Sequence, residues 1–499
     1  MNRTTVNRAP ESTETSLDPE NWDELRALGH RVLDDMVDYL QTIRDRPVWQ
    51  PLPDSAKRLF SAPLPTSGSG ASEVYDRIRD DILPYPTGNI HPRFWSWVGG
   101  TGTPTQLIAD MVISTMNSAG LGFDEVASTH VELQLLNWLK EMLGYPAGAS
   151  GLLVSGGSMA NLVGLAVARN QTSGFDMRKL GIRADGEPRL MFYASSETHS
   201  SVRKAIELLG HGSESLRTLP VLDDFTIDTG ALRKAIETDR QHGFRPACII
   251  ANIGTVNTGA IDPLHELADI AASERLWLHA DAAFGAFARL SPRSAALVDG
   301  LERADSLAFD LHKWLYVQYD CGCVLVKDSE AHRNTFSVLP SYLRSLDRGL
   351  ASGPLNFSEY GVQLSRSFKS LRAWMGLKSE GVARYAQQIE QNIRQAHYLD
   401  ERVRRHPDLE LLAPTALNIV NFRYAANGLD TEALNDLNAE ILMTLQERGI
   451  AAPSSTVLNG KFSLRVAICN HRSRREDFDA LVDGVVAIAG ELTGKIASR

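Results

Sequence analysis

Between residues 150 and 330, short apolar runs alternate with segments of helical periodicity, and no other feature constrains the fold of this chain as strongly. The runs have the length of buried strands. They cover residues 151–154, 190–194, 248–253, 276–280, 306–309 and 324–326. Such alternation predicts an α/β domain with a mostly parallel sheet covered by helices. Ligands of these sheets bind beyond the carboxyl ends of the strands.

The regions on either side of this domain have other patterns. Apolar residues recur at helical spacing over residues 21–44, and a Pro-rich connector follows. After residue 364, a helical stretch leads into short strands and further helices, which predicts a smaller α+β domain. We therefore predict a disordered tail at 1–19, an N-terminal helical arm at 20–100, a large domain at 101–370 and a small C-terminal domain at 371–499.

Composition argues against several classes of function. The chain has 499 residues, of which 43% are hydrophobic, and a formal net charge of −10. This acidic balance argues against nucleic acid or an anionic membrane as the main partner. No apolar run approaches the roughly 20 residues that span a bilayer, and residues 1–20 lack the apolar segment of a signal peptide. The cytoplasm is the expected location. No metal site is expected, because the spacing Cys321-Gly-Cys323 does not fit a zinc site.

A paired His312-Lys313 stands between two apolar runs that are typical of buried strands. Burial of an ammonium group without a partner is costly. The lysine therefore either turns to solvent, as an ordinary turn lysine does, or is neutral or covalently modified. A desolvated lysine has a lowered pKa and reacts with carbonyl groups.

Three further polar groups follow predicted strands. The turn from Ser155 to Ser158 precedes a helix, and its small residues let backbone N–H groups approach an anion. His199 opens another helix, and Asp281 ends an apolar strand where a carboxylate needs a partner. Each alone has an ordinary explanation as a tight turn, a helix cap or a buried polar residue. Pyridoxal 5′-phosphate (PLP) matches these groups and the lysine together, because it carries an aldehyde, a basic ring nitrogen, an aromatic face and a phosphate.

Five ordered motifs resemble the PLP-dependent decarboxylases of the aromatic L-amino acid and glutamate decarboxylase group. The motifs are Glu197-Thr-His199-Ser-Ser-Val, Leu278-His-Ala-Asp281-Ala-Ala, Asp310-Leu-His-Lys313-Trp-Leu, Gln363-Leu-Ser-Arg-Ser-Phe-Lys-Ser-Leu and Phe462-Ser-Leu-Arg465-Val-Ala-Ile. The resemblance begins near His91 and covers most of the chain. It implies a PLP-dependent transferase-like large domain of fold type I and a small C-terminal α+β domain. It also implies an N-terminal helical arm that packs on the partner subunit of a homodimer.

The resemblance further implies a role for individual residues. Lys313 would hold the cofactor as a Schiff base, Asp281 would bind the pyridine nitrogen, and His199 would stack on the ring. The other residues expected around the cofactor are Gly157, Ser158 and His312, near the phosphate, and Thr255.

A long segment with little regular pattern, residues 335–353, suits a mobile lid. Within it, Tyr342 stands 29 residues beyond Lys313, where the family places its catalytic tyrosine. A tyrosine hydroxyl can donate a proton to a carbanion. Related aldehyde synthases tend to have phenylalanine here, so tyrosine favours simple decarboxylation. A tyrosine that only packs is the alternative.

The expected reaction converts an L-amino acid, aromatic by preference, to its amine and CO2. Phe94, Trp95 and Trp97 either contact such a side chain or pack in the core. Decarboxylation of an acidic or other non-aromatic amino acid, oxidative aldehyde synthesis, and a pseudoenzyme that only binds are the alternatives. The sequence departs from its relatives at Asp310-Leu311, where they have Asn-Pro or Asp-Pro. It departs again at Gly99-Gly100, where animal aromatic decarboxylases have bulkier residues, and both departures weaken any inference about the substrate.

Overall fold

The computed structural model describes residues 15–182, 186–338, 346–425 and 428–497, and the chain divides into two compact units. One unit comprises residues 1–46 and 51–86, and the other comprises residues 47–50 and 87–499. The predicted domain boundaries after residues 100 and 370 stay predictions. Tyr342 and most of the predicted tail at 1–19 lie outside the described residues.

The N-terminal unit is helical in its described part. Its segments are α1 (Trp22–Gln41), the 3₁₀ turn η1 (Ile43–Asp45), α2 (Asp54–Leu59), α3 (Ala71–Arg77) and the π-helical turn η2 (Ile78–Ile82). Asn21 caps α1, because its side chain accepts two backbone N–H groups of the first turn. Tyr75 on α3 donates a 2.6 Å hydrogen bond to Asp35 on α1, which joins the two helices. The helix predicted over residues 21–44 is confirmed, although it ends earlier, at Gln41.

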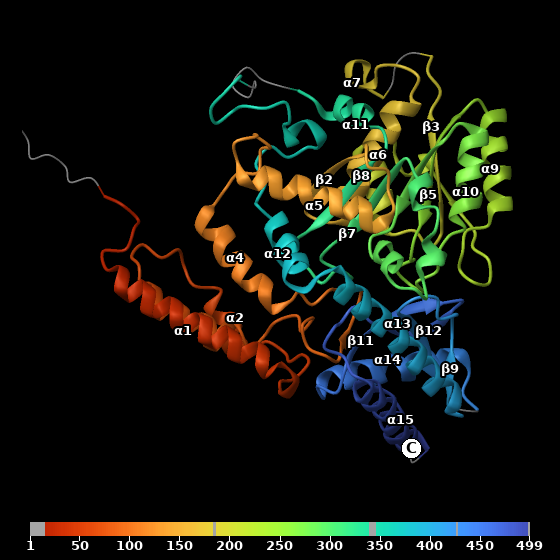
Figure 1. Cartoon of the computed structure of the whole chain (residues 1–499). Coiled ribbons are helices and arrows are strands. Elements are labelled where there is room, and N and C mark those ends of the chain that lie inside the picture. The colour runs from red at the N-terminus through yellow and green to blue at the C-terminus, as the bar shows by residue number, and fades with distance from the viewer. Residues whose placement is uncertain (1–14, 183–185, 339–345, 426–427, 498–499) are drawn as a thin grey trace, which may run out of the picture. The chain divides into compact units, whose positions relative to one another are not determined.

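A seven-stranded sheet organises the larger unit (Figure 1). Its strands, in spatial order, are β2 (Ser150–Val154), β8 (Gly322–Val326), β7 (Ser306–Asp310), β6 (Trp277–Asp281), β5 (Arg245–Asn252), β3 (Leu190–Ser195) and β4 (Leu216–Leu219). Every pair from β7 to β4 is parallel, and β8 is antiparallel to both of its neighbours. The mostly parallel α/β sheet is therefore confirmed. The sequence did not predict β4, because its run Leu-Arg-Thr-Leu is short and half polar.

Helices cover this sheet. The helices of this part of the chain are α4 (Pro104–Met116), α5 (Ala127–Leu143), α6 (Gly157–Thr172), α7 (Met177–Leu180), α8 (Ser200–Leu208), α9 (Thr229–Gln241), α10 (Leu264–Glu274) and α11 (Ser329–Phe336). Of these, α5, α6, α9 and α10 contact strands of the sheet. Short 3₁₀ turns η3 (Ser213–Ser215), η4 (Gly285–Leu290), η5 (Ala295–Val298), η6 (Leu301–Arg303) and η8 (Phe357–Tyr360) connect elements. Figure 1 shows α6 on one side of β5, and α9 and α10 on the other. Gly164 lets α6 approach the sheet closely, because a Cβ there would lie 2.6 Å from the ring of His279.

A second sheet, of five strands, is formed mostly by C-terminal elements, which Figure 1 draws in blue. Its strands, in spatial order, are β1 (Phe94–Trp95), β11 (Ala452–Leu458), β12 (Lys461–Ala467), β10 (Ile419–Tyr424) and β9 (Leu409–Leu411). The helices of this region are α12 (Ser370–Glu380), α13 (Val382–Arg405), α14 (Thr431–Glu447) and α15 (Arg475–Ala497). Trp95, Phe422 and Phe478 belong to its own hydrophobic core. Phe94 and Trp95 fall within the helical arm predicted at 20–100, yet they form β1, which pairs parallel with β11.

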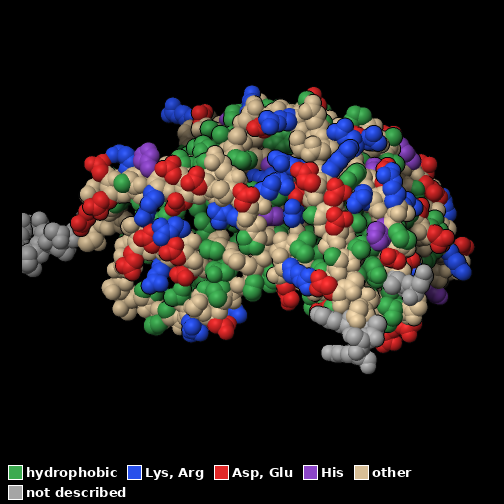
Figure 2. Space-filling view, turned by 90° about the horizontal axis from the view of Figure 1, so that it is seen from below, with side chains coloured by type: hydrophobic (Ala, Val, Ile, Leu, Met, Phe, Trp, Pro, Cys, Tyr) green, Lys and Arg blue, Asp and Glu red, His purple; other side chains and the backbone are tan. Residues whose placement is uncertain are grey.

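Charged residues of both signs share the surface. On the face shown in Figure 2, Lys and Arg side chains lie interspersed with Asp and Glu side chains. Among the described residues, no helix is both long enough and apolar enough to cross a membrane. The four cysteines are buried and free, as suits small apolar side chains.

Candidate active site

A cavity of about 400 Å³ opens where β5 and β6 end, and it reaches the second sheet. Asp281, the last residue of β6, and Lys313, from the turn after β7, lie on its wall. Strands β11 and β12 contribute Ser454, Ser455 and Arg465. The cavity therefore occupies the place that an α/β sheet offers to a ligand.

The amine of Lys313 is paired with a carboxylate three residues earlier in the chain. Its Nζ lies 2.9 Å from Oδ2 of Asp310, and its side chain is 23% exposed. Burial lowers the pKa of Lys313, but Asp310 and Asp281 outweigh burial and raise the pKa above its usual value. The lowered pKa expected from desolvation is therefore wrong for the cofactor-free chain, because Asp310 supplies the missing partner.

Hydrogen bonds and close packing hold the turn that carries Lys313. Trp314 Nε1 and Tyr316 Oη both donate to Oδ1 of Asn392 on α13, at 3.2 and 2.6 Å. Gly100 also packs against this turn, because a Cβ on it would overlap two backbone carbonyl oxygens of the turn. This contact gives a packing reason for glycine where animal relatives have a bulkier residue.

Asp281 is a buried carboxylate held by neutral donors. Its Oδ2 accepts a 2.8 Å hydrogen bond from Nδ2 of Asn161, and its Oδ1 accepts one of 3.2 Å from the backbone N–H of Ala283. Burial raises the pKa of Asp281, although the bond from Asn161 and the charge of Lys313 oppose that rise. A buried carboxylate of this kind is stabilised by a further cationic group in the cavity.

His199 caps helix α8 and lines the same cavity. Its Nδ1 accepts the backbone N–H of Ser201 at 3.2 Å and lies 2.8 Å from Oγ of Ser201. Burial lowers the pKa of His199, against the opposing charge of Asp281, so the ring is neutral near pH 7. A neutral aromatic ring on the wall of a cavity can stack on a planar ligand.

The glycine turn before α6 lies beside the Lys313 turn. A Cβ on Gly156 would lie 3.2 Å from the ring of His312. One on Gly157 would lie 3.4 Å from Ala283, which lines the cavity. Gly157 and Ser158 begin α6, where backbone N–H groups have no partner within the helix. The turn, the start of α6 and His312 thus lie together beside Asp310 and Ala283. Backbone N–H groups at the start of a helix favour an anion.

Thr255 is buried and lines the cavity. Its Oγ1 accepts the backbone N–H of Ala260 at 3.1 Å and lies 2.9 Å from Oγ1 of Thr258. The hydroxyl therefore serves its own turn, and the residue shapes the wall. The predicted proton donor, Tyr342, lies outside the described residues.

The three aromatic residues expected near the substrate separate into two groups. Phe94 and Trp95 are buried in β1, where they pack as core residues. Trp97 is 64% exposed and lines the cavity, together with Val98 and Phe284. Only Trp97 of the three remains a candidate for contact with a substrate.

Arg465 on β12 is a cavity residue to which the sequence assigned no role, although one of the motifs contains it. Its guanidinium donates to the backbone carbonyl groups of Trp97, Val256 and Asn257 and to Oγ of Ser454. Within the described part of the chain, no carboxylate forms an ion pair with it. Burial lowers the pKa of Arg465 to about 10. A buried cation that faces only neutral groups suits an anionic ligand.

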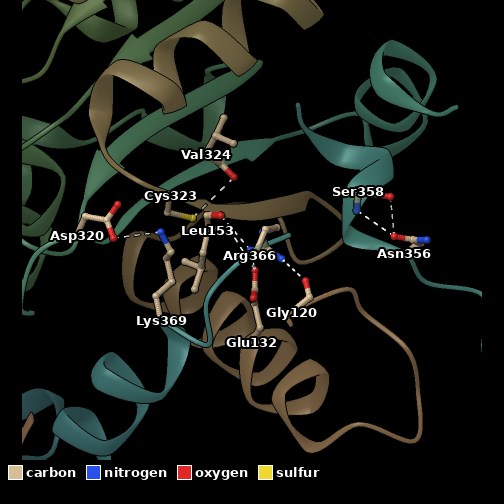
Figure 3. Close-up of polar contacts among 10 residues, drawn as sticks. All are labelled: Gly120, Glu132, Leu153, Asp320, Cys323, Val324, Asn356, Ser358, Arg366 and Lys369. Carbon is tan, nitrogen blue, oxygen red and sulfur yellow. Dashed lines mark hydrogen bonds and ion pairs between the residues drawn. The ribbon is translucent and has the colours of Figure 1, made fainter. Parts of the chain in front are cut away.

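The motif from Gln363 to Leu371 has a structural place beside β2 (Figure 3). The buried guanidinium of Arg366 forms an ion pair with Glu132 on α5 and donates to the carbonyl oxygens of Gly120 and Leu153. Arg366 does not line the cavity. Breaking such a buried pair is strongly destabilising, so this motif secures the fold around β2.

Comparison with known proteins decides the family. A family model described as the pyridoxal-dependent decarboxylase conserved domain matches residues 53–425. The chain belongs to this family. Its cofactor is therefore PLP, and the protein is a carboxy-lyase of the PLP-dependent decarboxylase family.

Two relatives and one solved structure show how far the similarity extends. The chain is 35% identical to an aromatic-L-amino-acid decarboxylase of Bacillus atrophaeus, over 94% of this chain and 96% of that protein. It is 29% identical to a phenylacetaldehyde synthase of Petunia hybrida, over 91% and 92% of the two chains. The crystal structure of Oryza sativa TDC with PLP and tryptamine matches with a TM-score of 0.88 at 27% identity, over 96% of this chain and 100% of that one. The α/β fold with a smaller C-terminal sheet is thereby confirmed.

The residues of the cavity fit this cofactor. Lys313 offers an amine, and Asp281 offers a buried carboxylate whose other contacts are neutral hydrogen-bond donors. His199 offers a neutral ring on the wall. The start of α6, which lies beside Ala283 of the cavity wall, offers backbone N–H groups that no side chain caps. Each chemical part of PLP thus has a complementary group in one region of the chain.

Proposed function

We propose that the protein decarboxylates an L-amino acid with an aromatic side chain in this cavity, to give the corresponding amine and CO2. One observation carries the proposal: Arg465, whose guanidinium has no carboxylate partner among the described residues, and the exposed ring of Trp97 line the same cavity as Lys313. Arg465 offers a site for a carboxylate, and Trp97 offers an apolar face for a side chain. We assign the carboxylate of the substrate to Arg465 on this basis.

Around the cofactor, each residue has a separate task. Lys313 would hold it covalently, Asp281 would keep a proton on the ring nitrogen, and His199 would stack on the ring. Gly157, Ser158 and His312 would surround the phosphate, and Thr255 would close the wall. When bound, PLP supplies an electron sink for the electrons left as CO2 departs. The protein contributes orientation, because it holds the amine-bearing end and the carboxylate of the substrate at fixed positions.

An aromatic substrate is favoured over an acidic one. The lining of the cavity includes Trp97, Val98 and Phe284, none of which carries a charge. We assign the α-carboxylate of the substrate to Arg465, and we assign no second Lys or Arg to a substrate carboxylate. The side-chain carboxylate of an acidic substrate therefore has no assigned partner. The Bacillus relative and the tryptamine in the Oryza structure support the same choice.

After CO2 leaves, a proton must reach the carbon that carried it. We assign this donation to Tyr342, because a phenol can protonate a carbanion and the family places a catalytic tyrosine there. Oxidative aldehyde synthesis is the second candidate, and the 29% identity to the Petunia synthase favours it. Tyrosine at position 342 favours formation of the amine over formation of the aldehyde.

We further propose that the protein acts as a cytoplasmic homodimer. Helix α4 exposes Ile108, Met111, Val112 and Met116, which are between 42% and 50% accessible. Their spacing places them along one side of the helix. An apolar stripe of this kind suits burial against a second copy of the chain.

The test is a substrate panel on the holoenzyme. L-tryptophan, L-phenylalanine, L-tyrosine, L-histidine and L-glutamate are each incubated under air, and CO2, amine, aldehyde and peroxide are measured. We expect CO2 and amine in equal amounts from at least one aromatic amino acid. Turnover of L-glutamate alone, or aldehyde with peroxide in place of amine, would reject the proposal.

A further inference from the structure

A continuous chain of hydrogen bonds leads from the core of the sheet to both residues proposed to contact the cofactor ring. On β6, the side chains of residues 277, 279 and 281 share one face, because alternate residues of a strand point the same way. That face meets α6 through Asn161. Asn161 is 1% exposed and lies outside the residues that the sequence singled out.

The direction of each hydrogen bond can be worked out from the carboxylate. Ionised Asp281 only accepts, so the group of Asn161 that lies 2.8 Å from it is the amide NH2. The amide oxygen of Asn161 then faces Nε2 of His279 at 2.9 Å, which must carry the proton. His279 Nδ1 therefore accepts from Ser306 Oγ at 2.8 Å, and that oxygen accepts from Trp277 Nε1 at 2.8 Å.

A branch from the same amide reaches the second ring-contacting residue. The NH2 group of Asn161 also donates to Oγ of Ser201, at 3.0 Å. The hydroxyl of Ser201 is then free to donate to Nδ1 of His199, at 2.8 Å. Since Nδ1 also accepts a backbone N–H, the ring proton of His199 belongs on Nε2.

We infer that Asn161 is a positioning residue that couples the protonation states of Asp281 and His199. This inference rests on the proposed function for the role of those two residues, but not for the geometry. Through one amide, Asn161 keeps Asp281 ionised and supports His199 as the neutral Nε2–H tautomer. His279 fixes the orientation of that amide, and burial lowers the pKa of His279 to about 3, so it stays neutral throughout the working pH range.

Asp281 and His199 each have a small set of charged neighbours. Asp281 faces Lys313 and His199, and His199 faces Asp310 and Lys204 as well. None of these charges changes when Asn161 is replaced by an uncharged residue. A shift in the titration of Asp281 in such a variant therefore reports the lost hydrogen bond.

The test compares variants of one helix in the full-length protein. Asn161→Leu removes both donors but keeps the branched shape of the side chain, and Asn161→Thr keeps one hydroxyl. Val163→Ala is the control, because Val163 is equally buried on α6 outside the network. We measure the Kd for PLP against pH in the cofactor-free protein, and the pH profile of kcat/KM in the holoenzyme. Nitrogen-15 NMR of the His199 ring reports its tautomer.

For Asn161→Leu we expect the Kd for PLP near pH 7 to rise about tenfold or more, as for loss of a hydrogen bond to a charged group. The acid limb of both profiles should move to higher pH, because Asp281 is protonated more easily. Asn161→Thr should restore much of the wild-type profile, and wild-type His199 should be the Nε2–H tautomer.

Unchanged profiles in Asn161→Leu, an equal shift in Val163→Ala, or a wild-type Nδ1–H tautomer would overturn the inference. A wild-type protein that binds no PLP would instead reject the proposed function, whatever the tautomer.

Discussion

Oδ2 of Asp310 lies 2.9 Å from Nζ of Lys313, and the negative charge of Asp310 raises the pKa of the amine in the cofactor-free chain, against the effect of burial. An amine must lose its proton before it can attack an aldehyde. We therefore predict that Asp310→Asn lowers the pKa of Lys313, because the neighbouring negative charge is gone. PLP should then attach to the cofactor-free variant at a lower pH than to the wild type. The measurement is the rate of growth of the visible cofactor band against pH, and an unchanged midpoint would contradict the role of Asp310.

Asp281 is predicted to matter for turnover more than for the fold. Asp281→Ala should reduce kcat/KM by roughly three powers of ten or more, because nothing then holds the proton on the ring nitrogen. The unfolding midpoint should stay near that of the wild type. Steady-state kinetics with urea unfolding of the same preparations check both statements. Asp299→Ala, an exposed carboxylate away from the cavity, is the control. A near-normal rate in Asp281→Ala would remove this residue from the mechanism.

Tyr342 is predicted to separate amine from aldehyde formation. With the preferred substrate under air, Tyr342→Phe should lose most amine production and release aldehyde and peroxide, because dioxygen reaches the carbanion before a proton does. Tyr319→Phe is the matched control, since the ring of Tyr319 lies 4.4 Å from that of His312 near the same site. Unchanged amine production in Tyr342→Phe would exclude the assignment, and a collapse in Tyr319→Phe alone would transfer the role to that residue.

Buried histidines are predicted to limit stability in acid. His332 is fully buried, its Nδ1 lies 2.9 Å from Oγ of Ser150, and burial lowers its pKa to about 4. The unfolded chain binds a proton at this residue below about pH 6.5, whereas the native protein binds it only below about pH 4. Its contribution to stability is therefore complete above pH 6.5 and is lost as the pH falls toward 4, by at most about 1.4 kcal/mol per pH unit.

His332→Asn tests this directly, because the amide can replace Nδ1 but does not titrate. We expect a lower free energy of unfolding at pH 7 and a shallower loss between pH 6.5 and 4.5 than in the wild type. Urea unfolding at several pH values measures the slope. His242→Asn is the control, because His242 is exposed to solvent. Equal slopes in His332→Asn and the wild type would show that His332 does not contribute.

Sequence periodicity predicted the large sheet because its central strands are buried on both faces and read as unbroken apolar runs. The same reasoning could not find β1, since two residues in an aromatic loop acquire strand geometry only by pairing with β11. The N-terminal helix was predictable because Asn21 caps a regular amphipathic pattern. Elements that depend on distant partners leave no local signal.

The candidate site shows the same division. Lys313, Asp281 and His199 were recognisable because each is a polar group in a position where burial is costly. Asn161 was not, because a small amide on an apolar helix has several ordinary explanations. The raised pKa of Lys313 could have been expected from the sequence, since Asp310 stands only three residues before it. Arg465 acquires its meaning only when β12 pairs with β11 and brings it to the cavity.

The central claim is that PLP is held at Lys313 in this cavity, and chemical trapping tests it most directly. The holoenzyme is reduced with borohydride, digested, and mapped by mass spectrometry, with Lys313→Arg treated in parallel. We predict a single pyridoxyl label on Lys313, loss of the visible band on reduction, and no label in Lys313→Arg. A label on another lysine, such as Lys204 or Lys327, or an unchanged label in Lys313→Arg, would contradict the account.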